Sequence, residues 1–245
     1  MHHPTQPHNS TLPPSSSQPP TRGTPETHAH TLVSCSDKFS NQPKDMSSTT
    51  LNYFGMPGRA EATRLALACG GKDFEDKRLT FPEYGSGKWA GKGLPVLEMD
   101  GAEYTQSIAL LRYAGTLAGL VPEDPLAALK VDEIVMICED MLAQIFKCYG
   151  QKDDAVAKTV MEGKLKTLLE VVNAKLEANS SPDFCVGDSL TIADLQVHAV
   201  IMNAQCGAFT GIPASFVGDT APRVMAVETA VMEDPKVKQY YESKK

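Results

Sequence analysis

The chain has 245 residues, of which 42% are hydrophobic, and a formal net charge of -7. This length suffices for one large domain or two small ones, and the apolar fraction suffices for a core. No apolar run approaches the roughly 18 residues that a membrane-spanning helix needs. The acidic balance argues against nucleic acid, because phosphate contacts require clustered Lys and Arg. We therefore expect neither a membrane nor a nucleic acid as partner.

The beginning of the chain differs in composition from the rest. Residues 1–48 are rich in Pro, Ser, Thr, His and Gln and poor in large aliphatic side chains. Such a segment cannot bury enough apolar surface to offset the entropy of ordering, so we expect a disordered low-complexity tail. It also lacks the continuous apolar core of a secretory signal. The six cysteines have no CxxC spacing and are interpreted mainly as small buried hydrophobes, which predicts a reducing, cytoplasmic location.

The histidines and cysteines show no metal-ligand pattern. Five of the six histidines lie in the first thirty residues, and the sixth, His198, lies alone within a helical pattern. A single buried histidine is more typical of a satisfied core residue than of a metal ligand. The sequence therefore predicts no metal cofactor.

Strands and helices alternate from residue 49 to residue 119. A strand ending near Phe54 is followed by a helix at about 60–68, and a second strand is expected at 73–79. A Gly- and Lys-rich loop precedes two short strands around Asp100 and Gly101, and Ser107 begins another helix. The order β-α-β-loop-β-β-α is too small for a doubly wound fold. It favours a compact mixed sheet of four strands.

Residues 125–245, after a linker at 119–124, read as helical throughout. Apolar residues recur at spacings of three and four over 131–145 and 165–176, which is typical of core-facing helices. Thr191 and Asp194 have the spacing of a capping box, in which Thr191 caps a helix and Asp194 reaches back to its amide. This box is a signal for folding rather than for catalysis. The fold class is therefore α/β followed by all-α.

A tyrosine and an arginine stand out at the first strand-to-helix turn. Tyr53 ends the strand, Gly55 and Gly58 break it, and Arg59 opens the helix. A hydroxyl at the carboxyl end of a strand faces the crevice where α/β folds bind ligands, and a nearby positive charge favours an anion there. An ordinary strand aromatic and a solvated arginine would give the same sequence. This motif alone therefore leaves open whether Tyr53 and Arg59 bind a ligand or have no functional role.

Four strings carry a resemblance to a known family. They are NYFGMPGRAE, GLPVLEMDG, QSIALLRY and VGDSLTIADL, in that order and at separations that span both halves of the chain. From Thr50 to its end the chain resembles a cytosolic glutathione transferase of the Tyr-type, sigma-like class. The resemblance implies a thioredoxin-like glutathione-binding domain at 49–119, an all-helical substrate-binding domain at 125–245, and a homodimer.

The resemblance also implies roles for individual residues. Tyr53, with Arg59 nearby, matches the tyrosine that donates a hydrogen bond to the glutathione sulfur. Leu94 and Pro95 match a cis-proline turn whose backbone pairs with the tripeptide. Asp140 matches an acid that reaches across the dimer to the glutamyl ammonium, although a solvated helix charge would look the same.

Gln106 and Ser107 match the pair that holds the γ-glutamyl carboxylate. Ser107 lies at a helix start, where free N–H groups and the helix dipole favour an anion. A simple N-cap is the alternative for Ser107, and both roles are compatible.

The resemblance weakens just before the proline turn. Where relatives commonly read PFGQLP this chain reads AGKGLP, so Gly91 replaces an aromatic residue that some classes use as a plug between subunits. The Trp and Lys that usually bind the glycine carboxylate cannot be aligned here. Lys88, Trp89 and Lys92 are candidates on residue type alone, and a solvated loop explains the lysines as well.

The implied activity is attack of the glutathione thiolate on small hydrophobic electrophiles, as in detoxification. A glutathione-dependent isomerase or peroxidase on the same fold remains open, and so does a non-catalytic binding or structural relative. Retention of Tyr53, Arg59, Gln106 and Ser107 speaks against the last of these. The electrophile pocket is expected near Met56 and the Cys148–Tyr149 end of a long helix, but the sequence does not identify the electrophile.

Overall fold

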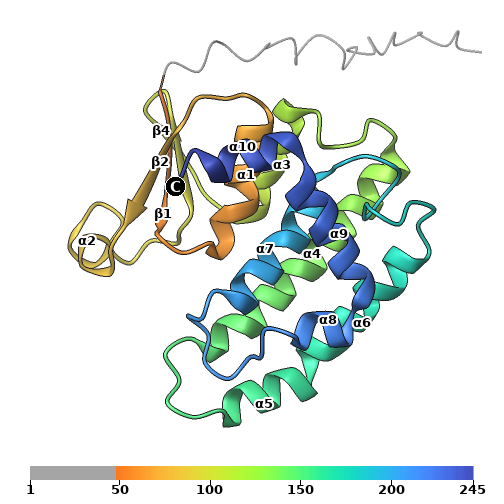
Figure 1. Cartoon of the computed structure of the whole chain (residues 1–245). Coiled ribbons are helices and arrows are strands. Elements are labelled where there is room, and N and C mark those ends of the chain that lie inside the picture. The colour runs from red at the N-terminus through yellow and green to blue at the C-terminus, as the bar shows by residue number, and fades with distance from the viewer. Residues whose placement is uncertain (1–47, 245) are drawn as a thin grey trace, which may run out of the picture. The chain divides into compact units, whose positions relative to one another are not determined.

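The computed structural model describes residues 48–244. These residues form a small sheet with three flanking helices, followed by a helical part (Figure 1). This arrangement confirms the predicted fold class. The predicted tail, apart from Ser48, lies outside the described residues.

The sheet is mixed and has four strands in the order β2-β1-β3-β4. The strands are β1 (Thr49–Phe54), β2 (Glu75–Leu79), β3 (Val96–Met99) and β4 (Ala102–Tyr104). β1 pairs with β2 in parallel and with β3 antiparallel, and β3 pairs with β4 antiparallel. Asn52 lies opposite Val96, and Leu97 lies opposite Tyr104. The end of β1, the start of β3 and the end of β4 therefore lie at the same end of the sheet.

Three α-helices and one 3-10 turn accompany the sheet: η2 (Gly58–Ala60), α1 (Glu61–Cys69), α2 (Phe81–Ser86) and α3 (Ser107–Ala118). α1 and α3 pack against each other. The prediction of a continuous loop after β2 is wrong, because α2 forms there with a capping box between Thr80 and Glu83. No residue of α2 is buried, so hydrophobic periodicity carried no signal for it.

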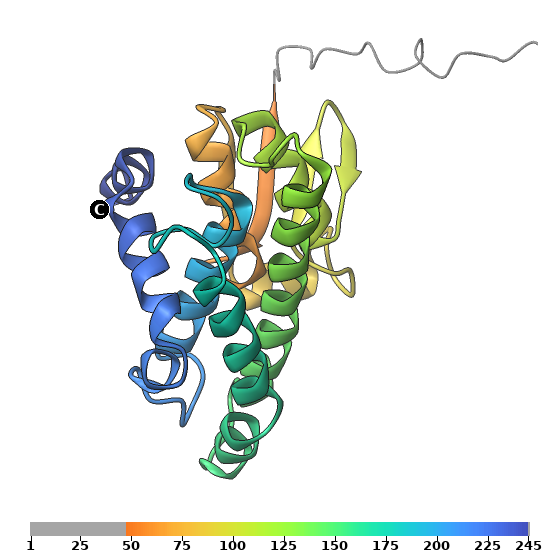
Figure 2. The same cartoon turned by 90° about the vertical axis from the view of Figure 1, so that its right-hand side faces the viewer.

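The helical part consists of α4 (Pro125–Ile145), η3 (Phe146–Cys148), α5 (Ala155–Glu162), α6 (Lys164–Glu177), α7 (Ile192–Gln205), α8 (Phe216–Thr220), α9 (Pro222–Glu233) and α10 (Pro235–Glu242). Figure 2 shows α4 running down the helical part. α7 contacts α4, α9 and, in the sheet part, α1. Nearly all of its residues are buried, as expected of a helix that is enclosed on all sides.

The predicted capping box at the start of α7 is confirmed. The hydroxyl of Thr191 accepts the N–H of Ala193, and the carboxylate of Asp194 accepts the N–H of Thr191 at 2.7 Å. Asp194 also accepts the N–H of Cys185 at 2.6 Å. The box thus ties the preceding loop to the helix.

The other residues singled out as core residues are mostly buried. His198 is fully buried and bonds Glu228 and Tyr241, which confirms it as a satisfied core histidine. All cysteines within residues 48–244 are free thiols, and each is buried except Cys206, which is exposed. Within the same residues no helix combines the length and apolar character needed to cross a membrane.

Candidate functional site

Tyr53 lies at the carboxyl end of β1 with its hydroxyl oxygen bound to the loop that follows. The oxygen accepts the backbone N–H of Arg59 at 3.1 Å. Gly58 has a positive φ of 51°, and a Cβ at this position would overlap the ring and hydroxyl of Tyr53. The hydroxyl proton is donated to no other group among residues 48–244. The phenol therefore retains one donor for a ligand.

The environment of Tyr53 keeps this donor protonated. Burial raises the pKa of the phenol above its ordinary value, and the N–H and guanidinium of Arg59 oppose that rise only in part. A phenol with a raised pKa remains neutral in the pH range where a thiol ionises. Tyr53 can therefore donate a hydrogen bond to a thiolate at neutral pH.

The side chain of Arg59 is held by the helical part. Its Nε forms an ion pair with Glu139 of α4, and its guanidinium carbon lies 4.5 Å from the centre of the Phe146 ring. Both partners were missed from the sequence, where Glu139 had no signal beyond its position beside Asp140. Glu139 partly neutralises the charge of the guanidinium. Arg59 therefore acts on the Tyr53 hydroxyl mainly through its backbone N–H rather than through its charge.

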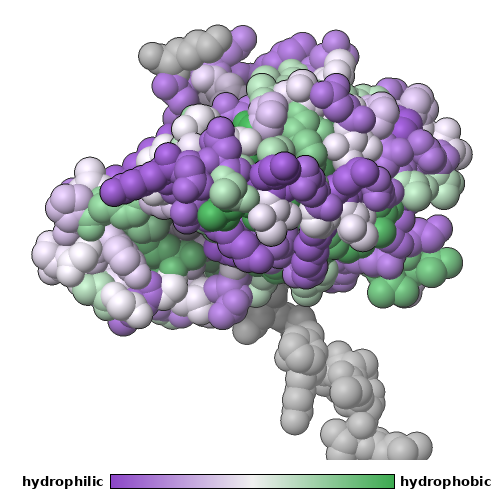
Figure 3. Space-filling view, turned by 90° about the horizontal axis from the view of Figure 1, so that it is seen from below, coloured by the Kyte–Doolittle hydropathy of each residue, from purple (hydrophilic) through white to green (hydrophobic). Residues whose placement is uncertain are grey.

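A cavity of about 320 Å³ opens beside Tyr53. It is lined mostly by aromatic and apolar side chains, contributed by both the sheet part and the helical part: Tyr53, Phe54, Met56, Arg59, Phe81, Tyr84, Lys92, Gly93, Leu94, Phe146, Tyr149 and Phe209. In the view from below, hydrophobic atoms gather in a hollow on the side of the molecule where α2 lies (Figure 3). Such a mainly apolar cavity with a few polar groups is typical of a small-molecule site.

Aromatic rings line the cavity from both parts of the chain. Phe146 and Phe209, from the helical part, are nearly parallel, with ring centres 5.3 Å apart. Phe81 of α2 and Tyr149 lie 6.0 Å apart and join the two parts. Met56 and Tyr149 line the cavity as expected, whereas Cys148 is fully buried and does not. The aromatic lining suits flat apolar ligands.

The proline turn lies at the same end of the sheet as Tyr53. The Leu94–Pro95 peptide bond is cis, as the resemblance implied. Leu94 lines the cavity, and neither its backbone N–H nor its C=O makes a hydrogen bond within residues 48–244. These two groups are therefore available to pair with an extended peptide.

The structure separates the three candidates for the glycine carboxylate. Lys92 lines the cavity, and its backbone carbonyl accepts the hydroxyl of Tyr84 at 2.7 Å. Trp89 does not reach the cavity, because its indole is buried against Leu79 and Val96. Lys88 does not line the cavity and pairs with Glu98 and Glu103, and the ammonium of Lys92 also lies 3.8 Å from Glu103. Tyr84 and Phe81 occupy the cavity wall instead, and the unrecognised helix α2 explains why the sequence missed them.

Gln106 and Ser107 lie at the start of α3, two residues beyond the end of β4. Gln106 has a φ of 73°, which is unfavourable for a residue other than glycine, and no side chain caps the helix. The side chains of Gln106 and Ser107 form no hydrogen bond or ion pair with the rest of residues 48–244. The first N–H groups of α3 are thus open to a ligand, at the same end of the sheet as Tyr53.

Asp140 lies outside the cavity. Its exposed carboxylate pairs with Lys164 of α6 at 2.9 Å. On the helical wheel of α4 it shares a face with three exposed apolar residues, Leu126, Leu129 and Met136. Asp140 therefore lies on an exposed, partly apolar face of α4, away from the cavity of its own chain.

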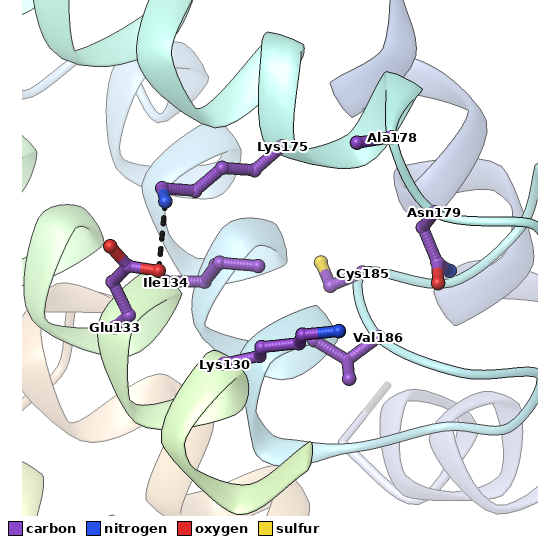
Figure 4. A pocket seen from close by; sticks show the side chains of 8 residues that line it. All are labelled: Lys130, Glu133, Ile134, Lys175, Ala178, Asn179, Cys185 and Val186. Carbon is purple, nitrogen blue, oxygen red and sulfur yellow. Dashed lines mark ion pairs between the residues drawn. The ribbon is translucent and has the colours of Figure 1, made fainter. Parts of the chain in front are cut away.

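A second cavity, of about 200 Å³, lies between α4, α6 and the segment that precedes α7 (Figure 4). The ammonium of Lys175 is paired there with Glu133 at 2.8 Å. Burial raises the pKa of the Cys185 thiol well above its usual value, so this thiol stays protonated. The described part of the chain also contains no cluster of His, Cys, Asp and Glu side chains that could hold a metal ion. Of the two cavities, the one at Tyr53 is therefore the stronger candidate for the functional site.

Comparisons with known proteins agree with this geometry. Residues 49–116 match the family model of the glutathione S-transferase N-terminal domain, and residues 139–244 match that of the C-terminal domain. The chain is 32% identical to glutathione S-transferase 1 of Ascaris suum over 62% of this chain and 78% of the relative. It is 28% identical to S-crystallin SL11 of Nototodarus sloanii over 80% of this chain and 96% of the relative. In fold it is similar to a sigma class GST of Fasciola hepatica, with a TM-score of 0.71 at 23% identity over 81% of this chain and 97% of that one.

Proposed function

Since the chain belongs to the glutathione S-transferase family, we propose that it is a transferase that joins the glutathione thiolate to small hydrophobic electrophiles. The observation that carries this proposal is the hydroxyl of Tyr53. It is held by the N–H of Arg59, keeps its own proton for a ligand, and lines a cavity that is otherwise mostly apolar. A binding protein without catalysis would need no such donor.

The hydroxyl acts on the ionisation of glutathione. A free thiol has a pKa near 8.5, and lowering that pKa by about two units requires about 2.7 kcal/mol of preferential thiolate stabilisation. One hydrogen bond from a neutral donor to a charged acceptor in a partly buried site supplies about 1.5 to 3 kcal/mol. Tyr53 therefore accounts for most of the activation, and the thiolate then attacks the electrophilic carbon.

The remaining polar groups orient the tripeptide. In this proposal the backbone of Leu94 pairs with the cysteinyl backbone of glutathione, and the open start of α3 at Gln106 and Ser107 binds the γ-glutamyl carboxylate. Lys92, which lines the cavity and lies 3.8 Å from Glu103, would turn its ammonium to the glycine carboxylate. Fixing glutathione at three points leaves its sulfur beside Tyr53 and the aromatic walls free for the second substrate.

We propose that two copies form a homodimer through the exposed face of α4. Leu126, Leu129 and Met136 are each more than half exposed and lie on one face. Such a stripe is typical of a surface that is covered in the assembled protein. Asp140 on the same face would then reach the glutamyl ammonium of glutathione in the partner's site. Within residues 48–244 the thiols are free and mostly buried, which supports a cytoplasmic location, and detoxification is the role that we propose.

Two assays test the activity. Retention on immobilised glutathione, followed by conjugation of chlorodinitrobenzene, should succeed with the full chain. Reduction of an organic hydroperoxide, measured in parallel, separates the transferase from a peroxidase on the same fold. Reduction of the hydroperoxide without conjugation would favour the peroxidase, and a protein that binds glutathione but shows neither activity would favour a non-catalytic relative.

The assembly is tested separately. Met136→Glu places a charge in the proposed interface, so sedimentation should show a dimer for the wild type and a monomer for the variant. Val171→Glu is the matched control, because Val171 is an exposed apolar residue of α6, outside that face. A wild-type monomer at assay concentration would contradict the proposed dimer.

Asp140→Ala tests the contact across the interface. Loss of the charge partner of an ammonium costs about 1.4 kcal/mol and should raise the half-saturating glutathione concentration roughly tenfold. Lys164→Ala is the control, since it removes the partner of Asp140 within the same chain. Equal behaviour of the two variants would leave Asp140 as a surface charge.

A further inference from the structure

Asn203 is a buried polar residue on α7, the central helix of the helical part. Its side chain is fully buried, and both polar atoms of its amide form hydrogen bonds. The Oδ1 atom accepts the backbone N–H of Gly58 at 3.0 Å, and Nδ2 donates to the carbonyl of Gly58 at 3.2 Å and to that of Ala199 at 2.7 Å. Only the bond to Ala199 lies within its own helix. The other two reach the loop that follows Tyr53, 145 residues earlier in the sequence.

The contact to the Gly58 carbonyl has a geometric consequence for Tyr53. The C=O of Gly58 and the N–H of Arg59 belong to one planar peptide unit and point in opposite directions. Asn203 binds the oxygen of this unit, and Tyr53 binds its N–H at 3.1 Å. Any rotation of the plane that releases one bond weakens the other. Asn203 therefore fixes the direction in which the Arg59 N–H donates to the Tyr53 hydroxyl oxygen.

The loop before this peptide is fixed by a different side chain. Arg64 of α1 is fully buried and donates to the carbonyls of Phe54, Met56 and Pro57. It makes no hydrogen bond to Gly58. Arg64 thus holds the loop as far as Pro57, and Asn203 holds the next residue, which has a positive φ and lies against the Tyr53 ring.

We propose that Asn203 is a positioning residue for the thiolate-activating hydroxyl, acting through the peptide unit between Gly58 and Arg59. The N–H of Arg59 occupies one acceptor position of the Tyr53 oxygen, which directs the hydroxyl proton away from the loop and toward the cavity. It also stabilises negative charge on that oxygen and so makes the hydroxyl a better donor. This inference rests on the proposed glutathione chemistry.

The test replaces Asn203 with an apolar residue of similar size. In Asn203→Leu both bonds to Gly58 are lost, the peptide unit is free to turn, and Tyr53 loses its N–H donor for part of the time. The pKa of glutathione bound to the enzyme should rise by about one unit, followed as ultraviolet thiolate absorbance, so conjugation at neutral pH should fall about tenfold. The half-saturating glutathione concentration should change less than twofold. Activity should recover toward the wild-type value at alkaline pH.

Asn203→Ser is the milder variant, because a short hydroxyl replaces the amide and the helix is little disturbed. It should shift the pH profile in the same direction by a smaller amount. Ile201→Ala is the matched control, since Ile201 is a buried residue of α7 whose truncation destabilises the helix packing without touching Gly58. It should lower the melting temperature and leave the pH profile unchanged. An unshifted pH profile in both Asn203 variants would overturn the inference.

A second measurement needs no glutathione. In protein that carries ring-labelled tyrosine, the Tyr53 resonance is identified by its absence in Tyr53→Phe, and its titration gives the pKa of the phenol directly. Loss of the N–H donor should raise this pKa in Asn203→Leu relative to the wild type. An unchanged pKa would overturn the inference even if conjugation is observed. A raised pKa in a protein that conjugates nothing would support the positioning role and contradict only the proposed reaction.

Discussion

The first turns of α3 and α7 satisfy their free N–H groups in opposite ways. At α7 the side chains of Thr191 and Asp194 bind the backbone of the same turn, and Asp194 is fully buried. At α3 the N-cap residue is Gln106 and the first helical residue is Ser107, and no side chain caps the helix. Gln106 also has a backbone conformation that favours glycine. One helix start is closed by the chain itself, and the other is left open.

The difference shows where the chain places stability and where it keeps binding capacity. A closed start contributes about 1 kcal/mol or more to the free energy of folding and offers nothing to a ligand. An open start gives up that contribution and retains N–H donors with a favourable dipole for an anion. The open start lies at the end of the sheet where Tyr53 and Leu94 border the cavity. Substitutions at the two starts should therefore separate stability from function.

Asp194→Ala should have the largest effect, and on stability alone. It leaves the N–H groups of Cys185 and Thr191 buried without their acceptor, at a cost of about 3 kcal/mol. The melting temperature should fall by about 10 °C, whereas turnover of the folded protein stays near that of the wild type. Asp124→Ala, at the exposed cap of α4, should cost only about 1 kcal/mol. Equal losses would show that burial adds nothing to the cap.

Tyr53→Phe should have the next largest effect, and on catalysis. Turnover at neutral pH should fall about 10- to 100-fold, because the thiolate loses its donor, while glutathione affinity changes little. The pH at which activity rises should move up toward the free-thiol pKa of about 8.5. Tyr104→Phe, at an exposed tyrosine of β4, is the control. Full activity in Tyr53→Phe would rule out the phenol as the activating group.

Ser107→Ala should weaken glutathione binding without weakening the fold. The hydroxyl makes no cap bond, so the melting temperature should not change. Loss of a hydrogen bond to a carboxylate should raise the half-saturating glutathione concentration about tenfold with a smaller change in maximal rate. Ser215→Ala, at another helix start without a side-chain cap, should alter neither quantity. A lowered melting temperature in Ser107→Ala would mean that both helix starts serve folding.

Gln106→Gly should have the smallest effect, raising the stability of the fold and weakening glutathione binding. Relief of the positive φ should stabilise the fold by about 1 kcal/mol, and loss of the amide should weaken glutathione binding. Gln106→Ala removes the same amide and keeps the strain, so it should weaken binding without the gain in melting temperature. If the two variants melt at the same temperature, the backbone at this position stores no strain.

Trp89 illustrates the limit of reasoning from residue type. Among the three candidates for the glycine carboxylate, the sequence could not show that the indole is buried against Leu79 and Val96 or that Lys88 pairs with two glutamates. The partners lie on β2, β3 and β4, so both outcomes depend on how the strands pair rather than on residues adjacent in the sequence. The role of Asn203 could not be predicted either, because a lone polar residue in an apolar helix does not reveal its hydrogen-bond partner.

Local patterns in the sequence determined the architecture and the nearest parts of the site. Strand-to-helix order, apolar periodicity, the capping box at Thr191 and the position of Tyr53 at a strand end depend on residues close together in the chain, and each could be predicted. Contacts over long separations were decided by the tertiary structure alone. Asn203 binds a peptide 145 residues earlier, and Glu139 meets Arg59 80 residues away. No local pattern encodes such pairs, because they exist only once α7 and α4 have packed against the sheet part.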